Sequence, residues 1–131
     1  MATLRLNANM ASYSPQNAYT DLHKLLLQVK ISHYVTKSFA AHSALGETYD
    51  DVNDLIDTIT EKLIGYSGID PQPFQIGTIS PMEPSPLGTM IMGIAKKLED
   101  YAEKIEYCDI ENLAQELSGV GAQLIYLSRF K

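Results

Sequence analysis

The longest uninterrupted helical pattern in the chain covers residues 39–66, and it sets the scale of the fold. No proline interrupts this stretch, and its apolar stripe consists of Leu45, Val52, Ile56, Ile59 and Leu63. Ser67-Gly68 then supplies the glycine that commonly ends a helix. A helix of about 28 residues is about 42 Å long at 1.5 Å per residue. Partners of similar length are needed to bury its stripe, so the pattern predicts a long helical bundle.

A second helix is predicted before it, over residues 15–36. Ser14-Pro15 is a typical helix start, with serine as the N-cap and proline at the first helical position. Neither glycine nor proline marks its end, but Ser38 is a suitable N-cap for the next helix. The turn between the two helices is therefore expected at residues 36–38.

Residues 69–85 cannot be helical throughout, because they contain four prolines at positions 71, 73, 81 and 84. Extended, this segment spans roughly 55 Å at about 3.3 Å per residue. It can therefore cross the whole bundle and let the third helix start at the same end as the second. A short strand or extended piece at residues 74–79 is weakly indicated.

Two further helices follow, with Ser85-Pro86 predicted to start the third and Asp109 to cap the fourth. Gly119 and Gly121 lie inside the fourth pattern and permit either close helix packing or a kink. Short turns within each pair and one long crossover predict an all-α, ferritin-like four-helix bundle. A helical bundle of other connectivity is the alternative. Residues 1–14 are expected to form an N-terminal arm, and residues 15–131 a single domain.

Composition excludes several classes of function. The formal net charge of −6 disfavours a nucleic-acid binder that neutralises phosphates. No apolar run reaches the roughly 18 residues of a membrane span, and the N-terminal stretch shows no signal peptide. The single cysteine, Cys108, allows no internal disulfide and suits a reducing compartment, so a cytoplasmic location is expected.

Two histidines and two carboxylates form the candidate site: His33, His42, Asp57 and Glu61. Imidazole and carboxylate are ligand types for iron and similar metals. Asp57 and Glu61 are four residues apart on one flank of the 39–66 helix, and a bound cation would offset their repulsion. The plain alternatives are a hydrogen-bonded histidine at the core edge and two solvated acids. Because the flank points away from the bundle centre, a shared ion predicts an interface with a second copy.

The segment from His33 to Gly68 resembles the ferroxidase segment of the Dps proteins, DNA-binding proteins from starved cells in the ferritin-like superfamily. The matching features are His33-Tyr34, then Phe39-Ala40-Ala41-His42, then Asp57 and Glu61 with Lys62-Leu63-Ile64-Gly65 after them. The resemblance implies that His33, His42, Asp57 and Glu61 bind iron at sites shared by two subunits. It also implies iron(II) oxidation by peroxide or dioxygen, with storage of the iron in a hollow homo-oligomer.

Three features depart from that family. The interval from His33 to His42 is shorter, with no glycine in the turn. Gly46 replaces a carboxylate expected one turn after the second histidine, with Glu47 beside it. The lysine-rich terminal tail of DNA-binding members is absent from this sequence, which argues against DNA as a partner.

Two other functions compete with iron oxidation. One is a structural or interaction oligomer, cellular or phage-borne, that keeps the bundle without the reaction. The other is a metal site of the DinB hydrolase kind, which needs a third histidine and has only His23 to offer. The acidic run on the third helix is interpreted as a solvated face, and Cys108 is assigned no chemistry.

Overall fold

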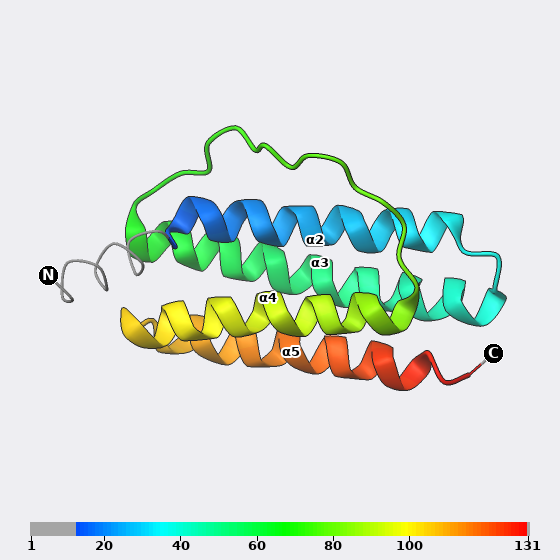
Figure 1. Ribbon diagram of the computed structural model, residues 1–131. Helices are drawn as coiled ribbons and strands as arrows, with labels where there is room; N and C mark the ends of the chain where they lie inside the picture. Colours follow the sequence, from blue (N-terminus) through cyan, green and yellow to red (C-terminus); the bar gives the residue numbers. More distant parts are fainter. Residues whose placement is uncertain (1–12, 131) are drawn as a thin grey trace, which may run out of the picture.

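The computed structural model describes residues 13–130, which form four α-helices and no strands (Figure 1). The helices are α2 (Pro15–Val35), α3 (Phe39–Ser67), α4 (Pro84–Lys104) and α5 (Cys108–Leu127). They lie side by side along one axis as a bundle, so the all-α prediction is confirmed. The predicted arm at residues 1–14 falls largely outside the described residues. None of the described helices is long and apolar enough to cross a membrane.

The starts of α2 and α3 lie where the sequence predicts them. The Ser14 hydroxyl accepts from the Asn17 amide at 3.3 Å, and the Asn17 side chain accepts from the Ser14 amide at 3.1 Å. Ser38 caps α3 by accepting from the Ala41 amide at 3.2 Å. At the far end, Gly68 adopts φ +71°, the left-handed conformation that ends helices easily with glycine.

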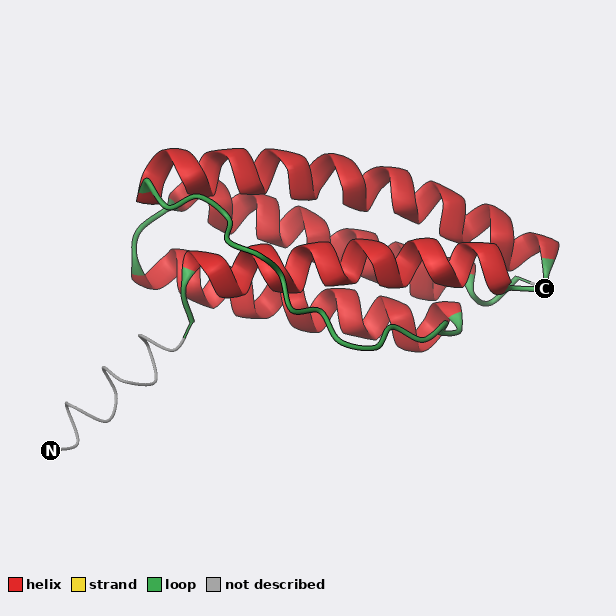
Figure 2. Cartoon of the chain, turned by 90° about the horizontal axis from the view of Figure 1, so that it is seen from above, coloured by secondary structure: helices red, strands yellow, loops and turns green. Residues whose placement is uncertain are grey.

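Residues 68–83 cross the bundle over the outer side of α2, as Figures 1 and 2 show. The segment is extended without a strand, and α2 holds it by side chains along its length. The Tyr19 hydroxyl donates to the Ile69 carbonyl at 2.7 Å, and the Ser32 hydroxyl accepts from the Met82 amide at 2.9 Å. As a result α4 starts at the same end as α3, and the predicted long crossover is confirmed.

Aliphatic side chains fill the space between the helices. Fully buried examples from each helix are Leu22, Leu45, Ile56, Leu98 and Leu117. The α4–α5 pair packs closest, because Gly88 and Gly121 face each other without side chains. A Cβ built on either glycine would lie 2.6 Å from the carbonyl oxygen of the other. Of the two predicted roles for Gly121, close helix packing is therefore the correct one.

The predicted starts of α4 and α5 are each wrong by two residues. α4 begins at Pro84 with Glu83 as N-cap, because Pro84 fits the first helical position as well as Pro86 does. α5 begins at Cys108, and Asp109 lies inside its first turn instead of capping it. The Asp109 carboxylate turns to α3, where it accepts from the Tyr66 hydroxyl and pairs with Lys62 at 3.3 Å.

This contact makes one contribution to stability depend on pH. The hydrogen bond from Tyr66, and then the Lys62 ammonium, lower the pKa of the Asp109 carboxyl below its ordinary value. A carboxylate whose pKa is lowered by folding stabilises the fold at pH values above the ordinary carboxyl pKa of about 4. That stabilisation is lost as pH falls through the folded-state pKa. At pH 7 we expect Asp109→Asn to unfold at lower urea than wild type, with the difference closing below about pH 4. A difference that stays constant with pH would contradict this origin, and the exposed Glu116→Gln is the matched control.

Candidate functional site

His33 and His42 meet across the short α2–α3 turn. Three residues, 36–38, connect the two helices and bring the last turn of α2 against the first turn of α3. The two imidazole rings stack with centroids 4.0 Å apart and planes inclined by 19°. Both side chains are at least partly exposed, so a ligand from solvent or from another chain can reach them.

Each histidine donates a hydrogen bond to the main chain of the other. The His33 Nδ1 lies 2.9 Å from the His42 carbonyl oxygen, and the His42 Nδ1 lies 3.0 Å from the His33 carbonyl oxygen. A carbonyl oxygen only accepts, so each Nδ1 carries the proton. The Nε2 of each neutral ring then keeps a free lone pair. Histidines that bind metals usually have this arrangement, with one nitrogen donating to a carbonyl or carboxylate and the other bound to the ion.

The stacking limits how the pair can bind metal. An imidazole binds an ion close to its own plane, at roughly 2.0–2.1 Å for zinc. Two nearly parallel planes, with centroids 4.0 Å apart, do not meet within that distance of either ring. The rings therefore cannot both hold one ion in this arrangement. Each Nε2 lone pair can therefore bind a separate ion, which other side chains can also coordinate.

Gly46 lies directly under the His33 ring. A Cβ at this position would be 2.9 Å from His33 Cε1 and 3.4 Å from Nδ1. Beside the ring is a hollow of about 260 Å³ with Lys30, Tyr49 and Asp50 in its wall. The ring therefore fills the space that a side chain at position 46 would take.

The two carboxylates lie elsewhere on α3. Asp57 is fifteen residues from His42, or about 22 Å along the helix at 1.5 Å per residue. Asp57 and Glu61 are both exposed, and within residues 13–130 neither makes a salt bridge or a side-chain hydrogen bond. No three ligand-type side chains in this part of the chain lie close enough to hold a metal ion. A single protomer thus brings the histidines together but leaves the carboxylates apart from them.

All these positions nevertheless share one flank of α3. His42, Gly46, Asp50, Asp57 and Glu61 are separated by steps of four, four, seven and four residues, which keeps them on one side of a helix. The imidazoles occupy the start of this flank and the carboxylates its second half. The candidate residues therefore form a row with a nitrogen end and an oxygen end.

The model of a family of unknown function, DUF5856, matches residues 33–127. The chain belongs to this family. The DUF5856 match begins at His33 and includes His42, Asp57 and Glu61, together with the whole of α3, α4 and α5. No curated protein matches the chain, and no solved structure matches it.

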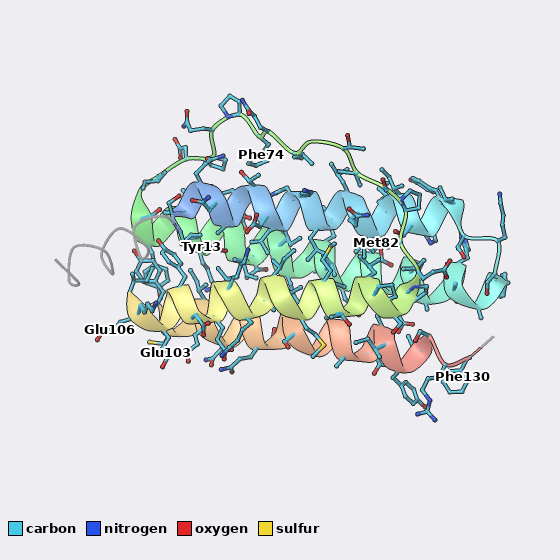
Figure 3. The ribbon with its side chains drawn as sticks, viewed as in Figure 1. Tyr13, Phe74, Met82, Glu103, Glu106 and Phe130 are labelled. Atoms are coloured by element: carbon cyan, nitrogen blue, oxygen red, sulfur yellow. The ribbon has the colours of Figure 1, made fainter. Side chains whose placement is uncertain are left out.

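The other candidate groups of this DUF5856 chain have structural partners. His23 stacks on Phe74 of the crossover with centroids 5.1 Å apart, and its Nδ1 lies 2.7 Å from the Tyr19 carbonyl oxygen (Figure 3 labels Phe74). It is ten residues, or about 15 Å along α2, from His33, so it cannot serve as the third ligand of a DinB-type site in this chain.

The acidic run at the end of α4 and in the following turn consists of Glu99, Asp100, Glu103 and Glu106. Its first two members pair with Lys96 at 3.7 and 3.1 Å, while Glu103 and Glu106 extend from the end of the bundle (Figure 3). Cys108 is exposed, and its thiol lies 3.9 Å from the Glu106 carbonyl oxygen. The exposure of Glu103 and Glu106 agrees with the interpretation of a solvated face.

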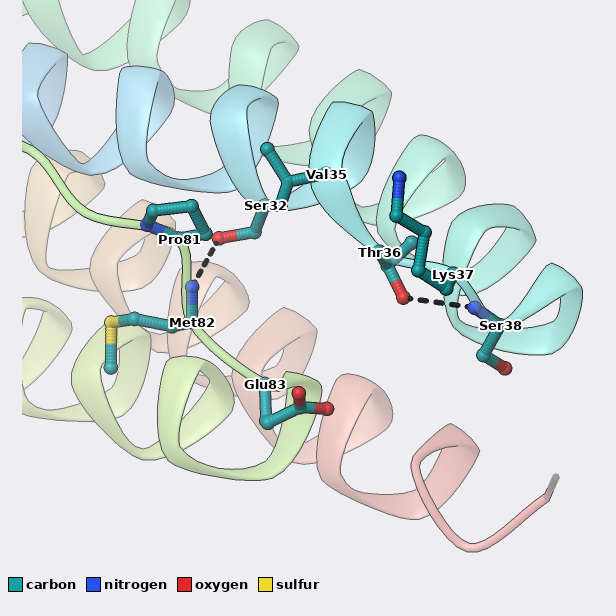
Figure 4. Close-up of a pocket in the computed structure, with 8 residues that line it drawn as sticks. All are labelled: Ser32, Val35, Thr36, Lys37, Ser38, Pro81, Met82 and Glu83. Atoms are coloured by element: carbon teal, nitrogen blue, oxygen red, sulfur yellow. Dashed lines mark hydrogen bonds between the residues drawn. The ribbon is translucent and has the colours of Figure 1, made fainter.

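A hollow of about 410 Å³ separates the α2–α3 turn from the end of the crossover (Figure 4). Its buried polar group, the Ser32 hydroxyl, donates to the Gln28 carbonyl at 2.7 Å and accepts from the Met82 amide at 2.9 Å. This hydroxyl therefore already has a donor and an acceptor partner within the chain.

Sequence reasoning missed the roles of Gly46 and Lys30. In the sequence Gly46 stands only as the replacement of a carboxylate of the resembled family, although it lies four positions after His42 and therefore one turn after it on the same face. The Lys30 ammonium lies 4.5 Å from the Tyr49 ring centroid and 3.3 Å from its hydroxyl. The available signal was spacing, since Lys30 is three residues before His33 on the same helix face.

Proposed function

We propose that this protein binds iron(II), oxidises it and sequesters it, and that it works as a homo-oligomer. The observation that supports this proposal is the reciprocal pair of Nδ1 hydrogen bonds between His33 and His42. Those bonds leave two Nε2 lone pairs free and fixed in direction. Nitrogen from imidazole and oxygen from carboxylate together form a ligand set that suits iron.

A second copy of the chain supplies what one protomer lacks. The nitrogen end and the oxygen end of the α3 flank are about 22 Å apart by helical rise, so they meet only if two flanks run antiparallel. A two-fold axis near the middle of the flank would bring His33 and His42 of one protomer to Asp57 and Glu61 of the other. Such an interface is self-complementary, because each protomer offers both ends.

In this proposal each side chain has a separate role. His33 and His42 would bind the ion through Nε2, and Asp57 and Glu61 would bind it through their carboxylates. Iron is the substrate: two iron(II) ions give one electron each to dioxygen, which takes up two protons to form peroxide, or to peroxide, which takes up two protons to form two water molecules. The chain's own residues hold the ion and neutralise its charge.

The test is aerobic oxidation of iron(II), followed by the absorbance of the ferric product. We expect wild type to exceed the protein-free background, and His42→Ala and Asp57→Ala to lose at least about tenfold in initial rate, since even outer-shell changes at metal sites cost 10–100-fold. Glu116→Ala, an exposed acid on α5, should match wild type. Background rates in wild type would remove the proposed activity.

A structural or interaction oligomer is the second candidate. It is favoured by the exposed apolar side chains at the end of the bundle, where Phe39 is 85% and Phe130 57% exposed (Figure 3 labels Phe130). They flank a hollow of about 340 Å³ lined also by Ala44 and Leu127. Light scattering with and without a chelator separates the candidates. If the protein is a structural or interaction oligomer, the assembly should persist after His42→Ala and should need no metal.

A further inference from the structure

We infer that Gly46 is a positioning residue for His33: the missing side chain leaves the space in which the imidazole ring is held and oriented. The inference concerns the ring itself. It rests on the proposed function only where it predicts metal affinity.

The first support is contact geometry. The three atoms nearest to a Cβ at position 46 all belong to the His33 ring, at 2.9, 3.4 and 3.8 Å. Separations below 3.0 Å between a Cβ and another atom are essentially absent from proteins, so any larger residue displaces the ring. The ring thus occupies the position that a side chain would take.

The second support is the hydrogen bond that crosses the glycine. In a helix the amide of residue 46 donates to the carbonyl of residue 42, and a carbonyl oxygen has a second lone pair. The His33 Nδ1 reaches this same carbonyl at 2.9 Å. A side chain at position 46 would push the ring away from that second lone pair. Gly46 therefore preserves the contact that fixes the proton on Nδ1 of His33.

The matching contact of His42 provides an internal comparison. His42 donates from Nδ1 to the His33 carbonyl, which lies in the last turn of α2 and has no helical partner of its own. That carbonyl is part of the main chain and does not move when the His33 ring moves. A change at position 46 should therefore alter the protonation pattern of His33 and leave that of His42 unchanged.

The chain also offers a matched control glycine. Gly65 lies in the same helix, and a Cβ at this position would meet nothing within 4 Å. Gly46→Ala and Gly65→Ala should therefore gain the same stability from the higher helix propensity of alanine. Only Gly46→Ala introduces a clash with the His33 ring.

The experiment measures the ring nitrogens by NMR in the metal-free protein at alkaline pH. Wild type and Gly65→Ala should show Nδ1 protonated in both histidines. Gly46→Ala should change the Nδ1 protonation of His33 and leave Nδ1 of His42 protonated. His33 nitrogens unchanged by Gly46→Ala would overturn the inference.

A double-mutant cycle gives a second test that does not depend on resonance assignment. With the ring removed by His33→Ala, Gly46→Ala should raise the urea midpoint as Gly65→Ala does in wild type. In the presence of His33 it should raise the midpoint less, or lower it. Equal effects in both backgrounds would mean that ring and glycine are not coupled, against the inference.

Cobalt(II) affinity, measured by titration calorimetry, links the ring to the site. Gly46→Ala should weaken it roughly 10–100-fold, the usual cost of losing a partner that orients a ligand, while Gly65→Ala leaves it unchanged. If wild type binds no cobalt(II), the proposed function fails, and the NMR result still decides the role of Gly46. If Gly46→Ala binds as tightly as wild type, the positioning role fails, and the proposed function stands.

Discussion

Gly88→Ala will lower the thermal midpoint by about 8 °C, which corresponds to roughly 2 kcal/mol at about 4 °C per kcal/mol for a domain of this size. The added methyl group would lie 2.6 Å from the Gly121 carbonyl oxygen and 2.6 Å from Ile125 Cγ1. The oxygen belongs to the main chain, so α4 and α5 must separate to make room. Overpacking of this kind typically costs about 1–3 kcal/mol, and more where backbone must move.

The control for this variant lies on the same helix. A Cβ on Gly93 meets nothing within 4 Å, so Gly93→Ala should gain up to about 1 kcal/mol from helix propensity alone. Differential scanning calorimetry of the two variants measures the contrast. If Gly88→Ala is as stable as Gly93→Ala, the close packing of α4 on α5 is wrong.

Removing both histidines, or both carboxylates, will weaken metal binding by at least about 100-fold. Each variant loses two direct ligands, and the loss of a direct ligand lowers affinity more than the loss of an outer-shell partner. One variant combines His33→Ala with His42→Ala, and the other combines Asp57→Ala with Glu61→Ala. All four side chains are exposed or half-buried, so the fold should persist, which circular dichroism checks. Anaerobic equilibrium dialysis with iron(II) gives the affinities. Retained affinity in the carboxylate variant would show that the histidines bind without a partner.

The sequence predicts α2, α3 and the crossover well because their signals are local. Ser14-Pro15, Ser38 and Gly68 each act within one helical turn. The end of α4 lacks such a signal. Glu106 there adopts φ +64° without being glycine, and the Tyr107 amide bonds to the Ala102 carbonyl at 2.9 Å. Packing against Tyr66 stabilises this turn, through a ring stack with Tyr107 at 4.2 Å that no local pattern encodes.

The candidate site is likewise predictable from the sequence only in part. The short turn makes it predictable that His33 and His42 lie close together, and helical angles place Asp57 and Glu61 on the flank. The partners of the two Nδ1 atoms are carbonyl oxygens, which every residue possesses, so composition cannot reveal them. The contact of Gly46 with His33 joins two helices, and its distance depends on how α2 and α3 pack.

The most direct test of a site shared between two chains is to mix the two double variants after reversible dissociation of the assembly. A mixed pair contains one protomer with intact histidines and one with intact carboxylates, so one of its two sites is complete. Random pairing makes half of the pairs mixed, and the mixture should recover about a quarter of the wild-type iron(II) sites at wild-type affinity. A mixture that binds no more iron(II) than the separate variants would contradict the shared site.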